Sequence, residues 1–258
     1  MTPVRFAREE DGLARITLDS PPLNLFDRAM IEGVADGVAQ LERAPARALL
    51  VGGEGRVVSG GVDVHLFEGL TPEDGGRLWT RLLDLVHRVE ALPFPTIFAA
   101  HALTLTAAFE LSLGCDLIVA AEGAQFGLVE VVVGLTPAMG GTQRLAERAG
   151  PGRARELVMT GGLYDAATLE RWNVVNRVWP DDEFAGKAER FARRLAAGPT
   201  LANAATKRIV RAYLEGGVRG ADAVVPEVAG GLFATEDLRN AVGTFLERGP
   251  GHATFEGR

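Results

Sequence analysis

Residues 91–121 read ALPFPTIFAAHALTLTAAFELSLGCDLIVAA, and they set the architecture of the chain. The first 19 of these residues carry no formal charge, and an uncharged run of this length can span a membrane. Two prolines break the start of the run, and His101, Thr104 and Thr106 divide the remainder. We therefore predict a buried strand over 95–100, a short helix over 107–114 and a second strand over 117–121.

The residues on the N-terminal side of this stretch alternate between strand and helix patterns. Period-two alternation predicts strands over 4–8 and 13–18, and the apolar run 48–51 is typical of a strand buried on both faces. Apolar residues at helical spacing predict helices from Asp27 to about Gln40 and from about Glu73 to Ala91. This alternation indicates the α/β class.

The sequence is mostly helical from Gly140 onward. The spacing of apolar residues predicts helices over 141–149, 152–160, 165–172, 182–197, 200–215 and 235–248. We therefore divide the chain into a core, residues 1–198, which carries the functional site, and a helical C-terminal region, residues 199–258.

The composition excludes several functional classes. The 258 residues are 47% hydrophobic and 24% charged, as in ordinary globular proteins, and the net charge of −7 argues against nucleic-acid and anionic-membrane partners. The single cysteine, Cys115, excludes a disulfide framework, and the four histidines lack the spacing of metal ligands. The charged N-terminal residues are unlike a signal peptide, so we expect a soluble, cytoplasmic protein.

Two glutamates are prominent because their surroundings are apolar. Glu110 and Asp116 are the only formal charges between residues 91 and 121, and Glu130 is the only one between residues 123 and 143. A salt bridge or an exposed edge explains either glutamate alone, because a bare buried carboxylate is costly. Two such residues in the most apolar part of the chain favour a catalytic acid and base.

Unpaired backbone donors are expected beside Glu110. The first turn of a helix that begins at Ala107 has free N–H groups, which favour an oxyanion. A second donor can come from the glycine-rich loop 59–63, where the backbone can approach a ligand closely.

Further motifs surround these residues in a fixed order. Pro21-Pro22-Leu23-Asn24 comes first, Gly60-Gly61-Val62-Asp63 follows, and the central segments AQFGLVE at 124–130 and GGTQRL at 140–145 come next. Two segments, 160–178 and 234–258, complete the series. Over nearly the whole chain these motifs resemble those of the crotonase superfamily, the enoyl-CoA hydratase/isomerase family, and the central signature is specific.

The resemblance implies a crotonase-like α/β spiral of repeated ββα units, with a helical C-terminal region that builds a homotrimer or a hexamer. It also implies an acyl-CoA thioester as the substrate, so that coenzyme A is part of the substrate and neither a cofactor nor a metal is needed. The implied reaction is the hydration of a 2-enoyl-CoA. One glutamate deprotonates a water that adds to C3, and the other delivers a proton to C2.

The resemblance assigns roles residue by residue. Glu110 and Glu130 match the two catalytic glutamates, with Glu130 as the acid, and the backbone N–H groups of Val62 and Ala107 form the oxyanion hole. The positions that match substrate-binding segments are Asn24, Leu25, Gly60, Gly61, Asp63 and His65.

The sequence departs from the family pattern at three places. Thr106-Ala107-Ala108 replaces three glycines, and the added Cβ atoms are expected to crowd the thioester and to forbid a positive φ. Val129 replaces a proline, and Phe94 replaces a basic residue that can face the phosphates of coenzyme A. Two alternatives therefore stay open: an enoyl-CoA isomerase, which needs one glutamate, and a weakly catalytic acyl-CoA binder with a spoiled oxyanion hole.

Overall fold

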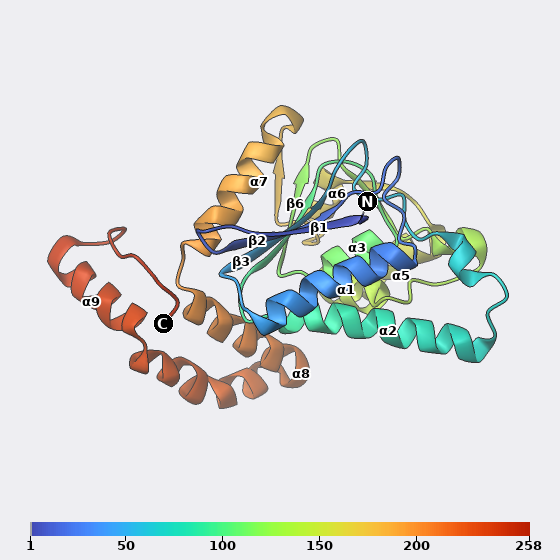
Figure 1. Ribbon diagram of the computed structural model, residues 1–258. Coiled ribbons are helices and arrows are strands. Elements are labelled where there is room, and N and C mark those ends of the chain that lie inside the picture. Colours follow the sequence, from blue (N-terminus) through green and yellow to red (C-terminus); the bar gives the residue numbers. More distant parts are fainter. Residues whose placement is uncertain (1) are drawn as a thin grey trace.

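The computed structural model describes residues 2–258 and contains a mixed six-stranded sheet (Figure 1). The strand order is β1-β2-β3-β4-β6-β9; β1 is antiparallel to β2, and the other neighbouring pairs are parallel. The strands are β1 (Val4–Arg8), β2 (Leu13–Leu18), β3 (Ala48–Gly53), β4 (Thr96–Ala100), β6 (Leu117–Ala121) and β9 (Arg177–Trp179).

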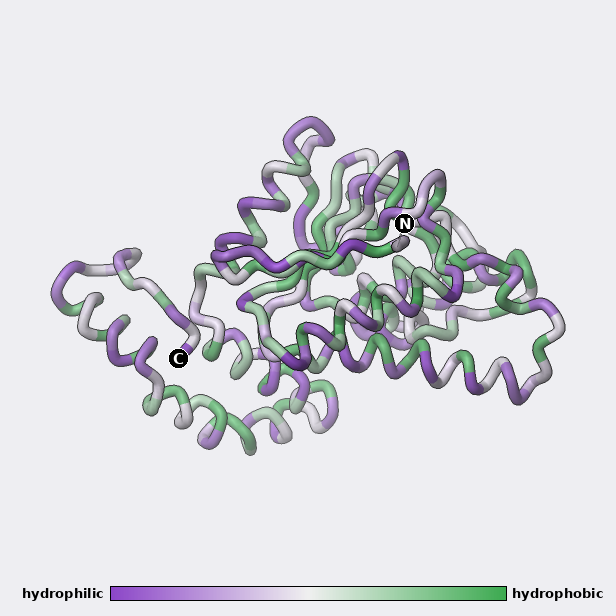
Figure 2. Tube along the Cα trace, viewed as in Figure 1, coloured by the Kyte–Doolittle hydropathy of each residue, from purple (hydrophilic) through white to green (hydrophobic). Residues whose placement is uncertain are grey.

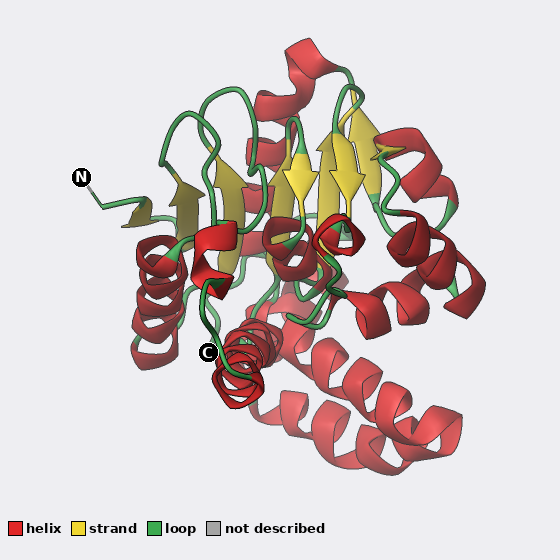
Figure 3. Ribbon diagram, turned by 90° about the vertical axis from the view of Figure 1, so that its right-hand side faces the viewer, coloured by secondary structure: helices red, strands yellow, loops and turns green. Residues whose placement is uncertain are grey.

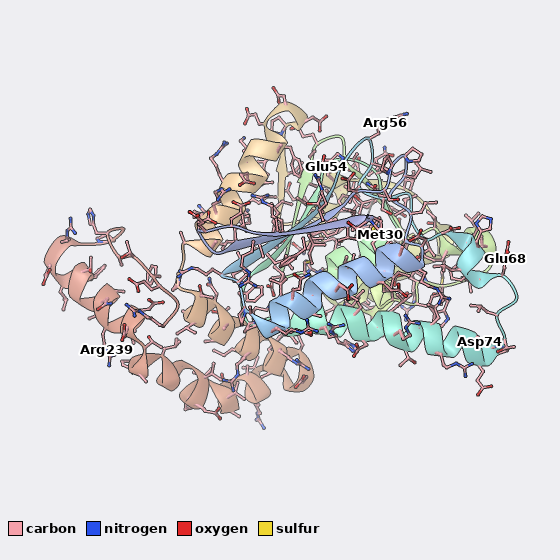
Figure 4. The ribbon with its side chains drawn as sticks, viewed as in Figure 1. Met30, Glu54, Arg56, Glu68, Asp74 and Arg239 are labelled. Atoms are coloured by element: carbon pink, nitrogen blue, oxygen red, sulfur yellow. The ribbon has the colours of Figure 1, made fainter. Side chains whose placement is uncertain are left out.

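Helices cover both faces of this sheet, because alternate side chains of each strand point to opposite sides. Leu49 and Val51 of β3 belong to the larger core, whereas Leu50 packs on the other face with apolar residues of α7. Figure 1 shows α7 on one side of the sheet and α1 and α2 on the other, and Figure 3 shows the helices around the strands. Met30 points from α1 toward the sheet and is fully buried (Figure 4). These helices are α1 (Arg28–Arg43), α2 (Pro72–Ala91), α3 (Ala107–Leu113) and α7 (Asp181–Ala196).

A second sheet of three short strands positions the two glutamates. Its order is β5-β7-β8, and β5 and β7 are parallel neighbours. Glu110 lies in α3, which follows β5, and Glu130 begins the 3-10 helix that follows β7. Because parallel strands end at the same edge of a sheet, both glutamates are brought to one side. The elements of this region are β5 (Thr104–Leu105), β7 (Gln125–Gly127), η2 (Glu130–Val133), α4 (Gly141–Ala149), α5 (Pro151–Thr160), β8 (Tyr164–Asp165) and α6 (Ala166–Arg171).

The C-terminal helices extend away from the sheet (Figure 1). They are α8 (Thr200–Gly230), η3 (Gly231–Ala234) and α9 (Glu236–Arg248). The helix predicted over 200–215 matches the first part of α8, which is interrupted at Gly217, where φ is 63° and ψ is −164°. A second helical part, which was not predicted, continues to Gly230. Figure 2 shows apolar stretches along these helices, and many of their apolar side chains are exposed: Val210, Tyr213, Leu214, Val218, Val225, Phe233, Val242, Phe245 and Leu246.

Most of the predicted elements are confirmed, and so is the α/β class. The Asp27 carboxylate accepts the Met30 N–H at 2.7 Å and caps α1, as the sequence predicts. The helix predicted over 165–172 begins at Ala166 in the structure, one residue later than predicted, because Asp165 ends β8 and its side chain caps α6. No helix within residues 2–258 is long and apolar enough to cross a membrane, and the uncharged run 91–109 forms parts of α2, β4, β5 and α3.

Two basic side chains tie the C-terminal helices to the core. Arg47 donates to the carbonyl oxygens of Ala196 and Gly198, where α7 passes into α8. Lys207 of α8 donates to the Asp116 carboxylate at 2.8 Å and to the Phe94 carbonyl at 3.1 Å. The Lys207 side chain is 17% exposed, so this ion pair is better shielded from water than the surface pairs of the molecule.

We expect Lys207→Met to lower the free energy of unfolding by about 1–2 kcal/mol, because it removes two charge-assisted hydrogen bonds while keeping an apolar stem. Lys187→Met is the matched control, since Lys187 pairs with Glu183 on the exposed side of α7 and its removal should change stability by less than about 0.5 kcal/mol. Urea unfolding of the two variants and of the wild type measures the difference. Equal losses in both variants would contradict a special role for Lys207.

Candidate active site

The glycine-rich loop 59–63 is held in place by hydrogen bonds to the segment 24–27. Ser59 Oγ donates to the Asn24 carbonyl at 2.7 Å and accepts the Gly61 N–H at 3.0 Å. The Phe26 N–H in turn donates to the Gly61 carbonyl at 2.8 Å. Gly61 has a φ of 104°, so glycine is needed for the turn that aims the Val62 N–H at α3.

The start of α3 faces this loop. The Val62 N–H donates to Thr106 Oγ1 at 3.0 Å, and Thr106 is the residue immediately before the helix. Ala107 begins α3, and its N–H donates to no acceptor among residues 2–258. The structure therefore brings the two predicted oxyanion donors to the same place, but the Val62 donor is engaged by a hydroxyl.

The backbone at Thr106 corrects one expectation. The Cβ of a threonine was expected to forbid a positive φ, yet Thr106 has a φ of 43° and a ψ of −116°. For a β-branched residue this conformation costs about 1–3 kcal/mol, and it persists only where the surroundings hold it. Two backbone hydrogen bonds do so: Thr106 N–H donates to Gly127 O at 2.9 Å, and the Glu110 N–H donates to Thr106 O at 2.8 Å. Ala107 and Ala108, by contrast, are helical.

Glu110 is buried and held by two backbone donors. Its Oε2 accepts the Met139 N–H at 2.8 Å and the Gly141 N–H at 2.7 Å. Burial raises the pKa of this carboxyl to about 8, and the nearby charge of Glu130 adds to the effect, while the two N–H groups oppose it. Oε1 accepts no hydrogen bond from residues 2–258 and is the atom free to contact a ligand.

Glu130 is placed at the beginning of η2 with its carboxylate turned inward. Both carboxylate oxygens are buried and have no hydrogen-bond donor within residues 2–258. Burial raises the pKa of Glu130 to about 7. The three valines that follow it are exposed, whereas Leu128 before it is fully buried, so Glu130 lies where the chain passes from the core to the surface. A buried carboxyl without protein donors is suited to exchange a proton with a ligand or a water.

The segment that supports Glu110 was not among the predicted site residues. Gly141 has no room for a side chain, because a Cβ there would lie 2.7 Å from the Glu110 Cγ. Arg144 is 8% exposed, pairs with Glu90 at 2.6 Å and donates to the Gly140 carbonyl, so it fixes the turn that presents the two N–H groups. The glycine pair before a basic residue in the 140–145 motif is the sequence signal that marks this turn.

The residues predicted to bind substrate fall into two groups. Asn24 is 1% exposed, and its amide nitrogen donates to the carbonyls of Glu54, Val57 and Val58, so its side chain positions the loop and has no surface to offer a ligand. Leu25, Gly60, Gly61, Asp63 and His65 lie along the loop itself or beside it.

His65 and Asp63 form an exposed pair next to the loop. Their side chains are 2.6 Å apart, and Asp63 also caps the 3-10 helix η1 (Val64–Phe67). This contact raises the pKa of His65 and lowers that of Asp63. The His65 side chain is 76% exposed, so a ligand that follows the surface of the loop can reach it.

The site has no cluster of potential metal ligands within residues 2–258. What it offers is a pair of carboxyl groups with raised pKa values, one unpaired amide and one amide linked to a hydroxyl. Such a set can transfer protons to and from neighbouring atoms while a carbonyl oxygen gains charge.

A family model described as Enoyl-CoA hydratase/isomerase matches residues 8–258. The Crotonyl-CoA hydratase of Syntrophomonas wolfei subsp. wolfei is 28% identical over 243 residues, covering 93% of this chain and 94% of that protein. The Short-chain-enoyl-CoA hydratase of Clostridium acetobutylicum is 26% identical, with 93% of each chain covered. The crystal structure of an enoyl-CoA hydratase from Bacillus anthracis has a TM-score of 0.91 at 26% identity, covering 99% of this chain and 100% of that chain.

Glu110 should make stability fall as pH rises. A carboxyl whose pKa is raised to about 8 in the folded protein binds a proton more tightly than in the unfolded chain, so its contribution is full below about pH 4.5 and is lost as pH rises through 8. We therefore expect the Tm of Glu110→Gln, relative to the Tm of wild type, to increase as the pH increases from 5 to 9. Calorimetry at several pH values measures this gain.

Glu32→Gln is the control for this experiment, because Glu32 is exposed on α1 and should leave the pH dependence of Tm unchanged. A Tm difference between Glu110→Gln and wild type that stays constant with pH would show that the Glu110 proton is not linked to folding.

Proposed function

The chain belongs to the enoyl-CoA hydratase/isomerase family and has the crotonase fold that the sequence predicts, and on this premise we propose that it is an enoyl-CoA hydratase. Its substrate would be a 2-enoyl-CoA thioester, and the product a 3-hydroxyacyl-CoA. The observation that carries the proposal is the presence of two buried carboxyls close enough for their charges to interact: Glu110, in the helix that begins at Ala107, and Glu130. An isomerase needs one such carboxyl.

The donors between loop 59–63 and α3 would bind the thioester oxygen. Addition of water to C3 pushes electron density through C2 onto this oxygen, and a donor fixed in advance stabilises the charge as it forms. The Ala107 N–H is unpaired among residues 2–258, so it can provide one hydrogen bond without breaking another. No metal or redox group is required by this step, since the thioester itself accepts the electron pair.

The two glutamates would divide the proton transfers. The base takes a proton from water while the water oxygen bonds to C3, and the acid gives its proton to C2. We assign Glu110 as the base, because the N–H groups of Met139 and Gly141 stabilise its ionised form. Glu130 is assigned as the acid, since its carboxylate oxygens accept no hydrogen bond from another residue within 2–258 and burial raises its pKa to about 7. The deeper burial of Glu110 raises its pKa further than that of Glu130 and acts against this assignment.

The exposed apolar side chains of α8 and α9 support an oligomer. Phe233 is 77% exposed and Leu246 is 78% exposed, and both lie in the region that we propose forms a homotrimer or hexamer. Large apolar side chains gathered on helices that extend from the core are typical of subunit contacts.

Glu110→Gln and Glu130→Gln should each lower kcat/KM for crotonyl-CoA by about 10²–10⁴-fold, because each removes one proton-transferring group and keeps the shape. The assay follows the loss of the conjugated-enoyl absorbance with crotonyl-CoA and with one longer 2-enoyl-CoA. Glu122→Gln is the matched control, since Glu122 is exposed after β6 and should keep wild-type activity.

Other outcomes of this assay identify the alternatives. Wild type that converts a 3-enoyl-CoA but hydrates neither 2-enoyl-CoA would be an isomerase. Wild type that binds both esters in calorimetric titration without turnover would be an acyl-CoA binder. A variant of either glutamate with full hydratase activity would contradict its role.

The wild type should have a mass in solution three or six times the 27.4 kDa of one chain. Introducing charge at the exposed apolar positions, as Phe233→Glu with Leu246→Glu, should reduce this mass to that of one chain, because the charges would be buried in the contact. Light scattering coupled to size-exclusion chromatography measures the mass of the wild type and of the double variant. Arg56→Glu, on a loop far from α9 (Figure 4), should leave the mass unchanged, and a monomeric wild type would contradict the proposal.

A further inference from the structure

The side chain of Thr106 covers one of the two amides of the oxyanion hole. The Val62 N–H donates to Thr106 Oγ1 at 3.0 Å, and a Cβ on Gly61 would lie only 2.5 Å from the same oxygen. Thr106 is 7% exposed, so the contact is shielded from water. A thioester oxygen therefore cannot accept the Val62 hydrogen unless Oγ1 is displaced.

The hydroxyl proton of Thr106 has no acceptor in the part of the chain that the structure describes. A hydroxyl can donate one hydrogen bond while it accepts others. Oγ1 accepts from Val62 but donates to no acceptor within residues 2–258. A buried donor without an acceptor is unfavourable, so the position favours a ligand oxygen.

The neighbouring donor lies on the next residue. Ala107, whose N–H is also without an acceptor in residues 2–258, follows Thr106 directly. The hydroxyl and this amide are thus fixed close together by the chain itself, at the start of α3. The hydroxyl is held in place by the hydrogen bond from the Val62 N–H, on a residue whose φ of 43° is strained.

We propose that the Thr106 hydroxyl, and not the Val62 amide, is the second donor of the oxyanion hole, with the Ala107 N–H as the first. This rests on the proposed function, in that the acceptor is the oxygen of an acyl-CoA thioester. The Val62 N–H then acts through Thr106. By donating to Oγ1 it polarises the hydroxyl and strengthens the hydrogen bond that the hydroxyl donates.

The sharpest variant is Thr106→Val, which keeps the shape and the β-branch but covers the Val62 amide with a methyl group. Its kcat/KM for crotonyl-CoA should fall about 10²-fold, the usual loss for one oxyanion donor. Thr106→Ser keeps the hydroxyl and should retain most of the activity. The kcat/KM of Thr106→Ala should also fall. The hydroxyl is missing in this variant, and the Val62 N–H lies 3.0 Å farther back than the position of Oγ1. Circular dichroism verifies that each variant is folded.

A second readout does not depend on turnover. A saturated acyl-CoA with a ¹³C-labelled thioester carbonyl is bound to each variant, and the carbonyl stretch is measured by infrared difference spectroscopy. Hydrogen bonding lowers this frequency, so wild type and Thr106→Ser should show a larger downward shift than Thr106→Val and Thr106→Ala. A merely structural role of Thr106 would leave the shift unchanged.

The outcomes separate this inference from the proposed function. Hydration by wild type with equal activity in Thr106→Val overturns the inference and leaves the function intact. A rise in activity in Thr106→Ala would show that the hydroxyl blocks the hole, which also overturns it. If wild type does not hydrate the 2-enoyl-CoA but shows a carbonyl shift that is lost in Thr106→Val, then the hydroxyl is a donor and the protein is not a hydratase.

Discussion

The hydrogen bonds from the Met139 and Gly141 N–H groups to Glu110 Oε2 are the contacts on which the whole site depends. They join the middle of α3 to the turn before α4, and they give a buried carboxylate the donors without which burial would be prohibitive. The same bonds fix the direction of α3, and therefore the direction of the Ala107 N–H and the Thr106 hydroxyl at its start. Arg144 extends this arrangement outward, because it binds Glu90 and the carbonyl of Gly140.

Sequence patterns predicted five of the six strands of the large sheet, because the side chains of these strands follow the burial of the two faces. The edge strand β9, with three residues, was not predicted. β2 alternates with period two, β3 and β4 are continuous apolar runs, and both patterns follow from which faces are covered. The strands β5 and β8 have only two residues each, too few for any period, so no pattern could identify them. The helix predicted over 200–215 ends where the backbone becomes non-helical at Gly217, and only the second helical part of α8, up to Gly230, was not predicted.

The site was predictable in its residue types but not in its contacts. Glu110 and Glu130 were visible because charge is scarce around them, and the structure places both on elements that follow the parallel strands β5 and β7. The burial of Asn24, which turns a predicted ligand contact into a support of the loop, depends on carbonyl groups 30 and more residues away. The contact between Val62 and Thr106 spans 44 positions and likewise leaves no trace in local sequence.

Two features of this small region lower the stability of the folded protein. Thr106 occupies a conformation that suits glycine, and two carboxyls with raised pKa values lie close enough for their charges to interact. Neither favours folding, so the surrounding core must compensate for both. The packing of Phe109 of α3 on Phe126 of β7, with ring centres 5.1 Å apart, is one such contribution, because it joins the helix that carries Glu110 to the strand that precedes Glu130. Glycine in place of Thr106 would relieve the backbone strain and raise the stability of the fold. A threonine that only filled space would bring no benefit in return, so we attribute the strain to the function of its hydroxyl.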